Sequence, residues 1–196
     1  MGKPLSDSAL DQLFRSARTY NGFDDTPVTE TELRAIYELV KMAPTSANCQ
    51  PLRIVWCVSD EAKEKLASLA SSTNGDKIRK APVTAIIGMD MAFYEKLPQL
   101  FPHADARSWF TGNEALIETT AFRNSSLQGA YFILAARALG LDTGPMSGFD
   151  NQAVDEAFFK DTTIRSNFIS TLGHGDPSTI FARSPRPVFE EMNRIV

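Results

Sequence analysis

Residues 113–139 form the longest helical candidate in the sequence, and this segment constrains the fold more than any other. Its centre, RNSSLQGAYFILAARALG, places small residues such as Ser125 and Gly129 among large apolar ones. Small residues allow another backbone to approach closely, so we expect a helix at the centre of the core. The charges of Glu118 and Arg123 argue against a segment that spans a bilayer.

Shorter helices and strands are predicted on both sides of this segment. Apolar residues at helical spacing predict helices over 6–19, from the TETE run to Pro44, over 60–70 and over 151–159. Runs rich in β-branched residues predict strands over 53–58, 81–89 and 164–173. Residues 92–112 are aromatic-rich and irregular, and residues 141–150 are predicted to form a loop rich in Gly and Pro. This order indicates an α+β or α/β fold with a small sheet.

The composition fits one domain over residues 1–196. A formal net charge of −4 without a basic cluster argues against a nucleic-acid surface. The two cysteines, Cys49 and Cys57, are too few for a disulfide scaffold or a four-thiolate metal site. The sequence has no secretory signal and no run of about 18 apolar residues, so we expect a cytoplasmic protein with no membrane partner.

Motifs of several enzyme classes are absent. The nearest match to a dinucleotide fingerprint, at residues 173–178, is not followed by a helix, and no P-loop or Gly-x-Ser-x-Gly motif occurs. The two histidines, His103 and His174, lack the spacing of metal ligands, so no metal is expected. A hydrolase that uses Cys49 with one of these histidines stays open, although free cysteine is commonly buried in the core.

Four segments that span nearly the whole chain form a recognisable pattern. In chain order they are residues 18–23 (RTYNGF), 44–51 (PTSANCQP), 145–149 (PMSGF) and 183–185 (RSP). Together they resemble the nitroreductase family of flavin enzymes. Further stretches, among them LPQLFPHADARSWF and ETTAFRNSS, resemble one branch of it, the malonic semialdehyde reductases of pyrimidine degradation. The resemblance implies an α+β fold with a central antiparallel sheet flanked by helices, in a homodimer that binds FMN at its subunit interface and takes hydride from NADH or NADPH.

The resemblance also implies which residues bind FMN. They are Arg18, Thr19, Asn21, Pro44, Thr45, Ser46, Asn48, Asn74, Met146, Ser147, Gly148 and Arg183. Arginine offers a planar fork of donors suited to a phosphate dianion, so Arg18 and Arg183 are expected there. The small residues of 44–48 suit the polar edge of the ring. The PMSGF loop suits its reactive end, where Gly148 permits close approach. Taken singly, these residues are equally typical of solvated arginines and ordinary turns.

Two positions depart from the family pattern. Asn21 stands where the family has a second arginine in its first motif, and Phe181 stands where a lysine is common. Each change removes one cation from the expected phosphate site. We therefore expect FMN to be held by fewer charges.

The branch resemblance implies reduction of malonic semialdehyde (3-oxopropanoate) to 3-hydroxypropanoate. His103, Arg107 and Arg123 are the candidates to bind the substrate carboxylate or to supply the proton. The structural alternatives are a surface Arg107 beside Asp105, and an ion pair of Arg123 with Glu118 or Glu114. Two other functions stay open: a broad-specificity nitroreductase or quinone reductase, and a flavin-binding protein without turnover.

Overall fold

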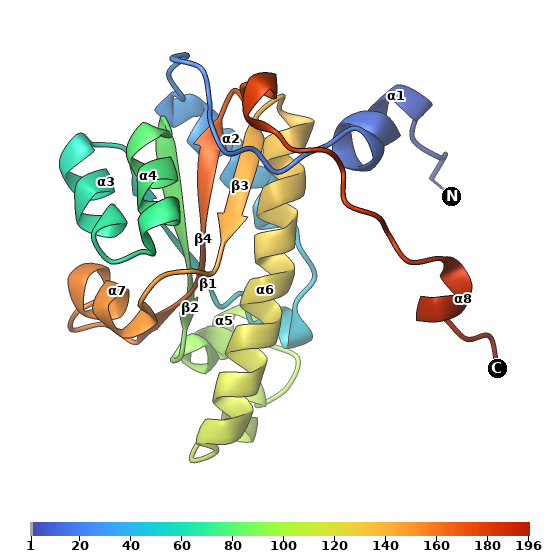
Figure 1. The fold of residues 1–196 in the computed structure, drawn as a ribbon. Coiled ribbons are helices and arrows are strands. Elements are labelled where there is room, and N and C mark those ends of the chain that lie inside the picture. The colour runs from blue at the N-terminus through green and yellow to red at the C-terminus, as the bar shows by residue number, and fades with distance from the viewer. Residues whose placement is uncertain (1) are drawn as a thin grey trace.

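A four-stranded antiparallel sheet forms the centre of the computed structural model, which describes residues 2–196 (Figure 1). The strands are β1 (Leu52–Cys57), β2 (Val83–Asp90), β3 (Asp142–Met146) and β4 (Ile164–Gly173). Their order in the sheet is β1-β2-β4-β3, and every neighbouring pair is antiparallel. β1 and β3 are therefore the two opposite edges of this sheet.

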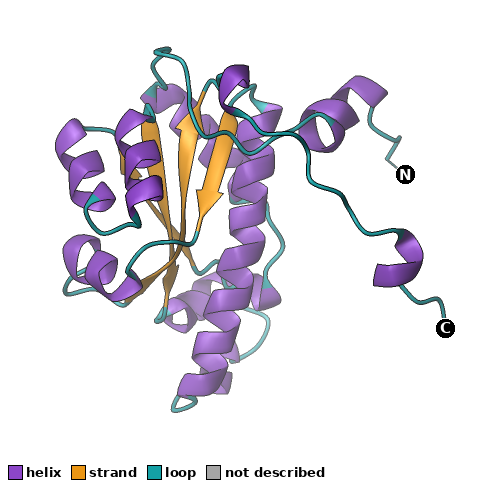
Figure 2. Cartoon of the chain, viewed as in Figure 1, coloured by secondary structure: helices purple, strands orange, loops and turns teal. Residues whose placement is uncertain are grey.

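Helices cover both faces of the sheet (Figures 1 and 2). The longer helices are α2 (Glu30–Val40), α3 (Asp60–Ala67), α4 (Ser72–Lys80), α6 (Glu114–Ala138) and α7 (Asn151–Phe158). The short helices are α1 (Asp7–Leu10), α5 (Leu97–Leu100) and α8 (Phe189–Met192). One apolar cluster lies between the sheet and α2 with α6, and a second lies between the sheet and α3, α4 and α7. The predicted antiparallel sheet flanked by helices is confirmed.

Helix α6 packs across the sheet, as its small residues predict. It begins after Asn113, whose side chain accepts a hydrogen bond from the backbone N–H of Leu116. At Gly129 an added Cβ would lie 2.5 Å from the ring of Phe168 in β4, so glycine is required for this close contact. No helix in residues 2–196 has the length and apolar character needed to cross a bilayer.

The segment between β2 and α6 builds a third apolar cluster under the first half of α6. It contains three short helical pieces, Phe93–Lys96, Leu97–Leu100 and Ala106–Trp109. The rings of Phe93 and Phe110 meet edge to face with their centroids 4.9 Å apart. The aromatic residues predicted in an irregular stretch therefore form a small core of their own.

The prediction of a loop over residues 141–150 is wrong for its first half, because this part forms the edge strand β3. Proline cannot donate to a ladder and is therefore excluded from central strands. Pro145 lies opposite Ser170 of β4 and has no strand on its other side, so the missing N–H breaks no pair. At the edge of the sheet a proline is compatible with a strand, so Pro145 does not require a loop here.

Two helical predictions also need correction. The helix expected over 6–19 ends early. Helix α1 is followed by a π-helical turn over Asp11–Arg15. At Thr19 the backbone is no longer helical and forms a bridge with Thr143 of β3. The helix expected over 60–70 ends at Ala67, and α4 follows without a signal in the sequence. Helix α4 packs tightly on the end of α3, since an added Cβ at Gly75 would lie 2.8 Å from the carbonyl oxygen of Ala67.

Candidate functional site

Four arginines line a cavity of about 480 Å³ beside the start of β3. They are Arg18, Arg137, Arg183 and Arg186. No carboxylate lines this cavity, and within residues 2–196 none of the four guanidinium groups forms an ion pair. Cations gathered in this way repel one another unless an anion is present. The cavity is therefore suited to a ligand with more than one negative charge, such as a phosphate.

Backbone contacts bring the two ends of the chain together at this cavity. The N–H of Tyr20 donates to the carbonyl of Thr143 in β3 at 3.1 Å, which fixes the N-terminal segment along the sheet edge. Arg183 then donates from Nη2 to the carbonyls of Arg15 and Ala17, at 2.9 and 3.0 Å. Arg18 donates to the carbonyl of Phe181 in return.

Two further residues predicted to bind FMN line the same cavity. These are Thr19 and Asn21. The amide of Asn21 donates to the carbonyl of Thr179 at 2.9 Å, so it holds the C-terminal segment in place.

The far end of β3 holds the second part of the predicted flavin site. The carbonyl of Gly148 accepts hydrogen bonds from the backbone N–H of Ser71 and from Nδ2 of Asn74, at 3.0 and 3.1 Å. An added Cβ at Gly148 would lie 2.7 Å from that Nδ2. In this chain glycine therefore allows α4 to approach, whereas the sequence suggested approach of a flavin. Ser147 is the first residue after β3, which is an edge strand of the sheet.

The loop that leads into β1 has an unusual backbone. Ala47, Asn48 and Gln50 have φ values of 49°, 50° and 43°, in the left-handed region that side chains other than glycine rarely adopt. Such conformations cost about 1 kcal/mol or more each and persist where surrounding contacts impose them, often at functional sites. Asn124 of α6 is one such contact, because its Oδ1 accepts from the N–H of Ser46 at 2.9 Å.

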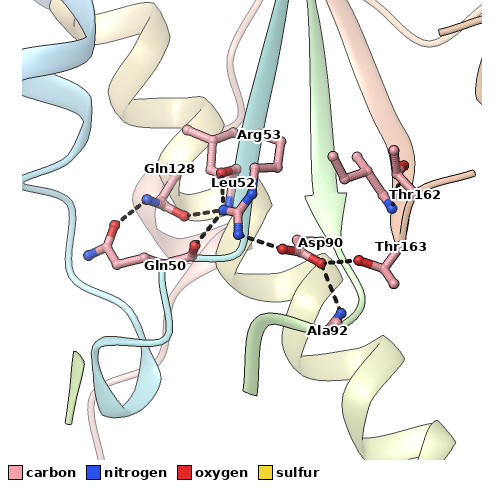
Figure 3. Close-up of polar contacts among 9 residues, drawn as sticks. Gln50, Leu52, Arg53, Asp90, Ala92, Gln128, Thr162 and Thr163 are labelled. Carbon is pink, nitrogen blue, oxygen red and sulfur yellow. Dashed lines mark hydrogen bonds and ion pairs between the residues drawn. The ribbon is translucent and has the colours of Figure 1, made fainter. Parts of the chain in front are cut away.

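A polar network holds the end of this loop against α6 and the sheet (Figure 3). Buried Gln128 of α6 accepts from the N–H of Leu52 at 3.0 Å and donates to Oε1 of Gln50 at 2.6 Å. Arg53 donates to the carbonyl of Gln50 and forms an ion pair with Asp90 at the end of β2. The loop is thus fixed by side chains from α6, β1 and β2.

The predicted FMN-binding residues fall into two groups. The β3-edge group comprises Arg18, Thr19, Asn21, Asn74, Met146, Ser147, Gly148 and Arg183, and the β1-edge group comprises Pro44, Thr45, Ser46 and Asn48. Two strands separate β1 from β3, and at about 4.8 Å per step the edges lie about 14 Å apart. Both faces between them are covered by helices. This separation argues against contact of one flat ring with both groups of the same chain.

The three candidate substrate residues have different surroundings. Arg107 forms two hydrogen bonds with the carboxylate of Glu95, at 2.7 and 2.9 Å, and not with Asp105. These bonds lower the pKa of Glu95 and raise the pKa of Arg107. His103 stacks edge-on against Phe101, with ring centroids 5.4 Å apart. The charge of Arg107 is already matched.

Arg123 is placed differently. It lines a mostly apolar hollow of about 730 Å³ on the exposed face of α6, with Met89, Phe122 and Leu127. Within residues 2–196 it forms no ion pair; the expected partner, Glu118, instead contacts Arg165 at 3.7 Å. Arg123 is therefore an arginine without an ion pair in a mostly apolar hollow, which the carboxylate of Glu118 also lines.

Cys49 does not suit the hydrolase alternative. Its side chain is 1% exposed, and burial raises the pKa of its thiol to about 11. The thiolate required for nucleophilic attack is therefore scarce at neutral pH.

A model of the nitroreductase family matches residues 14–174. The chain belongs to the nitroreductase family. This match includes all four strands and every residue of both edge groups except Arg183.

Relatives of this nitroreductase agree with the assignment. A Burkholderia lata protein, provisionally named NADH dehydrogenase/NAD(P)H nitroreductase, is 64% identical over 97% of this chain and 98% of its own length. A Polynucleobacter asymbioticus protein with the same name is 55% identical over 100% of both chains. The predictions of an oxidoreductase, and of FMN with NADH or NADPH, are confirmed at the level of the family.

Solved structures show the same fold. A nitroreductase from Bacillus subtilis has a TM-score of 0.88 at 26% identity, over 97% of this chain and 100% of that chain. A nitroreductase from Exiguobacterium sibiricum, solved in complex with FMN, has a TM-score of 0.86 at 21% identity over 100% of both chains. The predicted nitroreductase-like fold is confirmed.

Sequence reasoning missed two arginines of the cavity in this nitroreductase. Arg137 lies near the C-terminal end of α6, and Arg186 lies in the tail three residues after Arg183. Neither belongs to a motif, so only the positive charge near Gly140 and near the RSP segment could have signalled them.

Proposed function

We propose that this chain is an FMN-dependent NAD(P)H oxidoreductase that reduces malonic semialdehyde to 3-hydroxypropanoate in the cytoplasm. The observation that carries the cofactor proposal is the cavity with four arginines and no acid. Guanidinium groups bind phosphate through charge-assisted hydrogen bonds, and a ribityl phosphate provides the missing negative charge.

We propose that the rest of FMN lies along β3. Strand β3 leads from Thr143, beside the cavity, to Ser147, a distance of about 14 Å at 3.4 Å per residue. Ser147 and Asn74 then offer polar groups to the ring, from the end of the strand and from α4. When bound, FMN would accept hydride from NAD(P)H and return it to an acceptor.

The two-edge geometry supports a homodimer. Since the β1-edge group cannot contact a ring placed on the β3 edge of its own chain, a second copy must supply it. Apolar residues line the exposed face of α6, where Leu116, Phe122, Leu127 and Tyr131 are 39 to 54% exposed. Monomers seldom leave such a long apolar stripe in water, and a second copy would cover it.

The C-terminal tail supports the same arrangement. Beyond the segment that lines the cavity, the tail carries α8 away from the sheet (Figure 1). Val188, Phe189 and Met192 are 58%, 56% and 68% exposed there. A tail with apolar side chains and few contacts to its own chain is suited to packing on a partner.

Arg123 is the residue that we assign to the substrate carboxylate. It lies in the same turn of α6 as Asn124, which holds the β1-edge loop, and we propose that the hollow and this loop serve the same flavin site. A semialdehyde acid has a charged end and a small apolar middle, as the hollow requires. His103, in the aromatic segment, is the candidate proton donor for the forming alkoxide.

A second candidate function within the family has an observation in its favour. The hollow on α6 is lined mainly by apolar groups, and both named relatives are described as NAD(P)H nitroreductases. A nitroarene or a quinone would pack there without needing Arg123. Anaerobic bleaching by NADH or NADPH separates either enzyme from a passive flavin-binding protein.

We expect Arg123→Gln to raise the KM for malonic semialdehyde at least tenfold, because it removes a charge-assisted contact worth about 1.5–3 kcal/mol. The KM for an uncharged nitroarene should change less than about twofold. Steady-state rates with both acceptors measure this, and Arg34→Gln, which removes an arginine paired with Glu30, is the matched control.

Equal effects of Arg123→Gln on both acceptors would contradict the carboxylate role. So would a selective effect of Arg107→Gln in its place. Faster turnover of a nitroarene or quinone by the wild-type enzyme would favour the second candidate function.

A further inference from the structure

Arg137 is a cavity arginine whose guanidinium group has few hydrogen-bond partners in residues 2–196. Its Nη1 donates to the carbonyl of Leu13 at 3.0 Å, and its own carbonyl accepts from Nε2 of Gln12 at 2.7 Å. These bonds attach the N-terminal segment to the end of α6. Its Nε is buried without a hydrogen-bond partner in residues 2–196, and Nη2 has none in that range either.

The electrostatic surroundings of Arg137 are unfavourable in the chain alone. Burial lowers the pKa of this guanidinium, and the positive charge of Arg183 lowers it further. Asp142 opposes these effects but forms no ion pair with Arg137. Its Oδ2 instead accepts from the N–H of Gly175 at 3.1 Å, and burial raises the pKa of this acid. A half-buried cation without a close counter-charge calls for an anion in the cavity.

Asn21 adds no positive charge to the cavity, although the resemblance implies an arginine at this position. At this position the side chain is neutral and its amide is committed to the carbonyl of Thr179. Arg137 lines the same cavity, and it lies on a rigid helix and not on a loop. A phosphate that reaches Arg18 and Arg183 would therefore also meet the free side of Arg137.

We propose that Arg137 binds the FMN phosphate and replaces the cation that Asn21 does not supply. This inference rests on the proposed function, since it presumes that FMN occupies the cavity. It extends the phosphate site from the two ends of the chain to the C-terminal end of α6.

The test compares FMN with riboflavin, which has the same ring and no phosphate. Dissociation constants are measured by quenching of flavin fluorescence on the full chain freed of flavin. We expect Arg137→Met to weaken FMN at least tenfold while the affinity for riboflavin changes less than twofold. Arg137→Lys should recover part of the loss. Arg15→Gln, which removes a nearby arginine paired with Asp7 and Asp11, should bind both flavins as the wild type does.

The melting temperature of the flavin-free protein adds a second readout. Arg137→Met removes an uncompensated half-buried charge, so we expect this temperature to be unchanged or higher. Inorganic phosphate should raise the melting temperature of the wild type and raise that of Arg137→Met less.

Three outcomes would count against the inference. Equal loss of FMN and riboflavin, with a lower melting temperature, would show a purely structural role for Arg137. Wild-type FMN affinity in Arg137→Met, with weaker binding in Arg18→Gln, would overturn the inference and leave the proposed function intact. A wild-type chain that binds no FMN would overturn both.

Discussion

Replacing Arg18 and Arg183 together with glutamine should give a folded protein that purifies without flavin. Each guanidinium is expected to form charge-assisted hydrogen bonds with the phosphate, at about 1.5–3 kcal/mol apiece. Loss of both should weaken FMN by a factor of about 10² to 10⁴. Glutamine can still donate to the carbonyls that Arg183 now holds, so the tail should keep its path.

The measurement is the flavin absorbance of the purified protein, followed by titration with FMN. Circular dichroism confirms that the variant is folded. Arg15→Gln is again the matched control, because this side chain is paired with Asp7 and Asp11 outside the cavity. If the double variant retained flavin at the wild-type level, the four-arginine cavity would not be the phosphate site.

Leu127→Glu should convert the proposed dimer to a monomer and remove most of the bound flavin. Leu127 is 46% exposed in the single chain, so the substitution should not disturb the fold of that chain. In a dimer joined through the α6 stripe it would bury an unpaired carboxylate, which costs several kcal/mol. Light scattering after gel filtration measures the mass, and absorbance measures the flavin.

Val58→Glu is the control for added negative charge. Val58 is 50% exposed, and it follows β1 on the side that leads to α3, away from the α6 stripe. This variant should stay dimeric and yellow. A Leu127→Glu variant that remained a dimer with full flavin would place the interface elsewhere.

Much of the fold follows from local patterns. The β-branched runs predict β1, β2 and β4, and the small residues of the long helix predict its central place. Strand β3 escapes prediction because Pro145 and the glycines of this segment favour a loop, and only the sheet edge makes a strand possible there. Helix α4 escapes because its formation depends on contact with α3.

The site was predictable where a motif carries it. Arg18 and Arg183 meet at one cavity, as the resemblance implies for residues at opposite ends of the chain. Arg137 was not predictable, because a lone arginine near a helix end is common and its place on the cavity wall depends on the tertiary fold. The pairing of Arg107 with Glu95 likewise depends on how the aromatic segment folds back on itself.

The separation of the two edge groups is a further property that no local pattern contains. The motif residues Ser46 and Ser147 both flank strands of one sheet, yet the strand order places them at opposite edges. Sequence order alone gives no strand order, since two of the three neighbouring pairs join strands in sequence and the third does not. This separation is the reason why we propose that a second chain contributes to the flavin site.

Mixed dimers test whether the two edge groups of one flavin site come from different chains. One chain carries Arg18→Gln with Arg183→Gln, and the other carries Ser46→Trp, which would fill the place of the ring at the β1 edge. Ser46 is exposed in the single chain, so the indole should be tolerated there. The two chains are co-expressed with different tags, and the heterodimer is purified through both.

If each flavin site uses the β3 edge of one chain and the β1 edge of its partner, the heterodimer has one intact site and one doubly damaged site. We then expect about one FMN per heterodimer and almost none in either homodimer. A heterodimer as empty as both homodimers would contradict it, because that result requires both edge groups to come from the same chain.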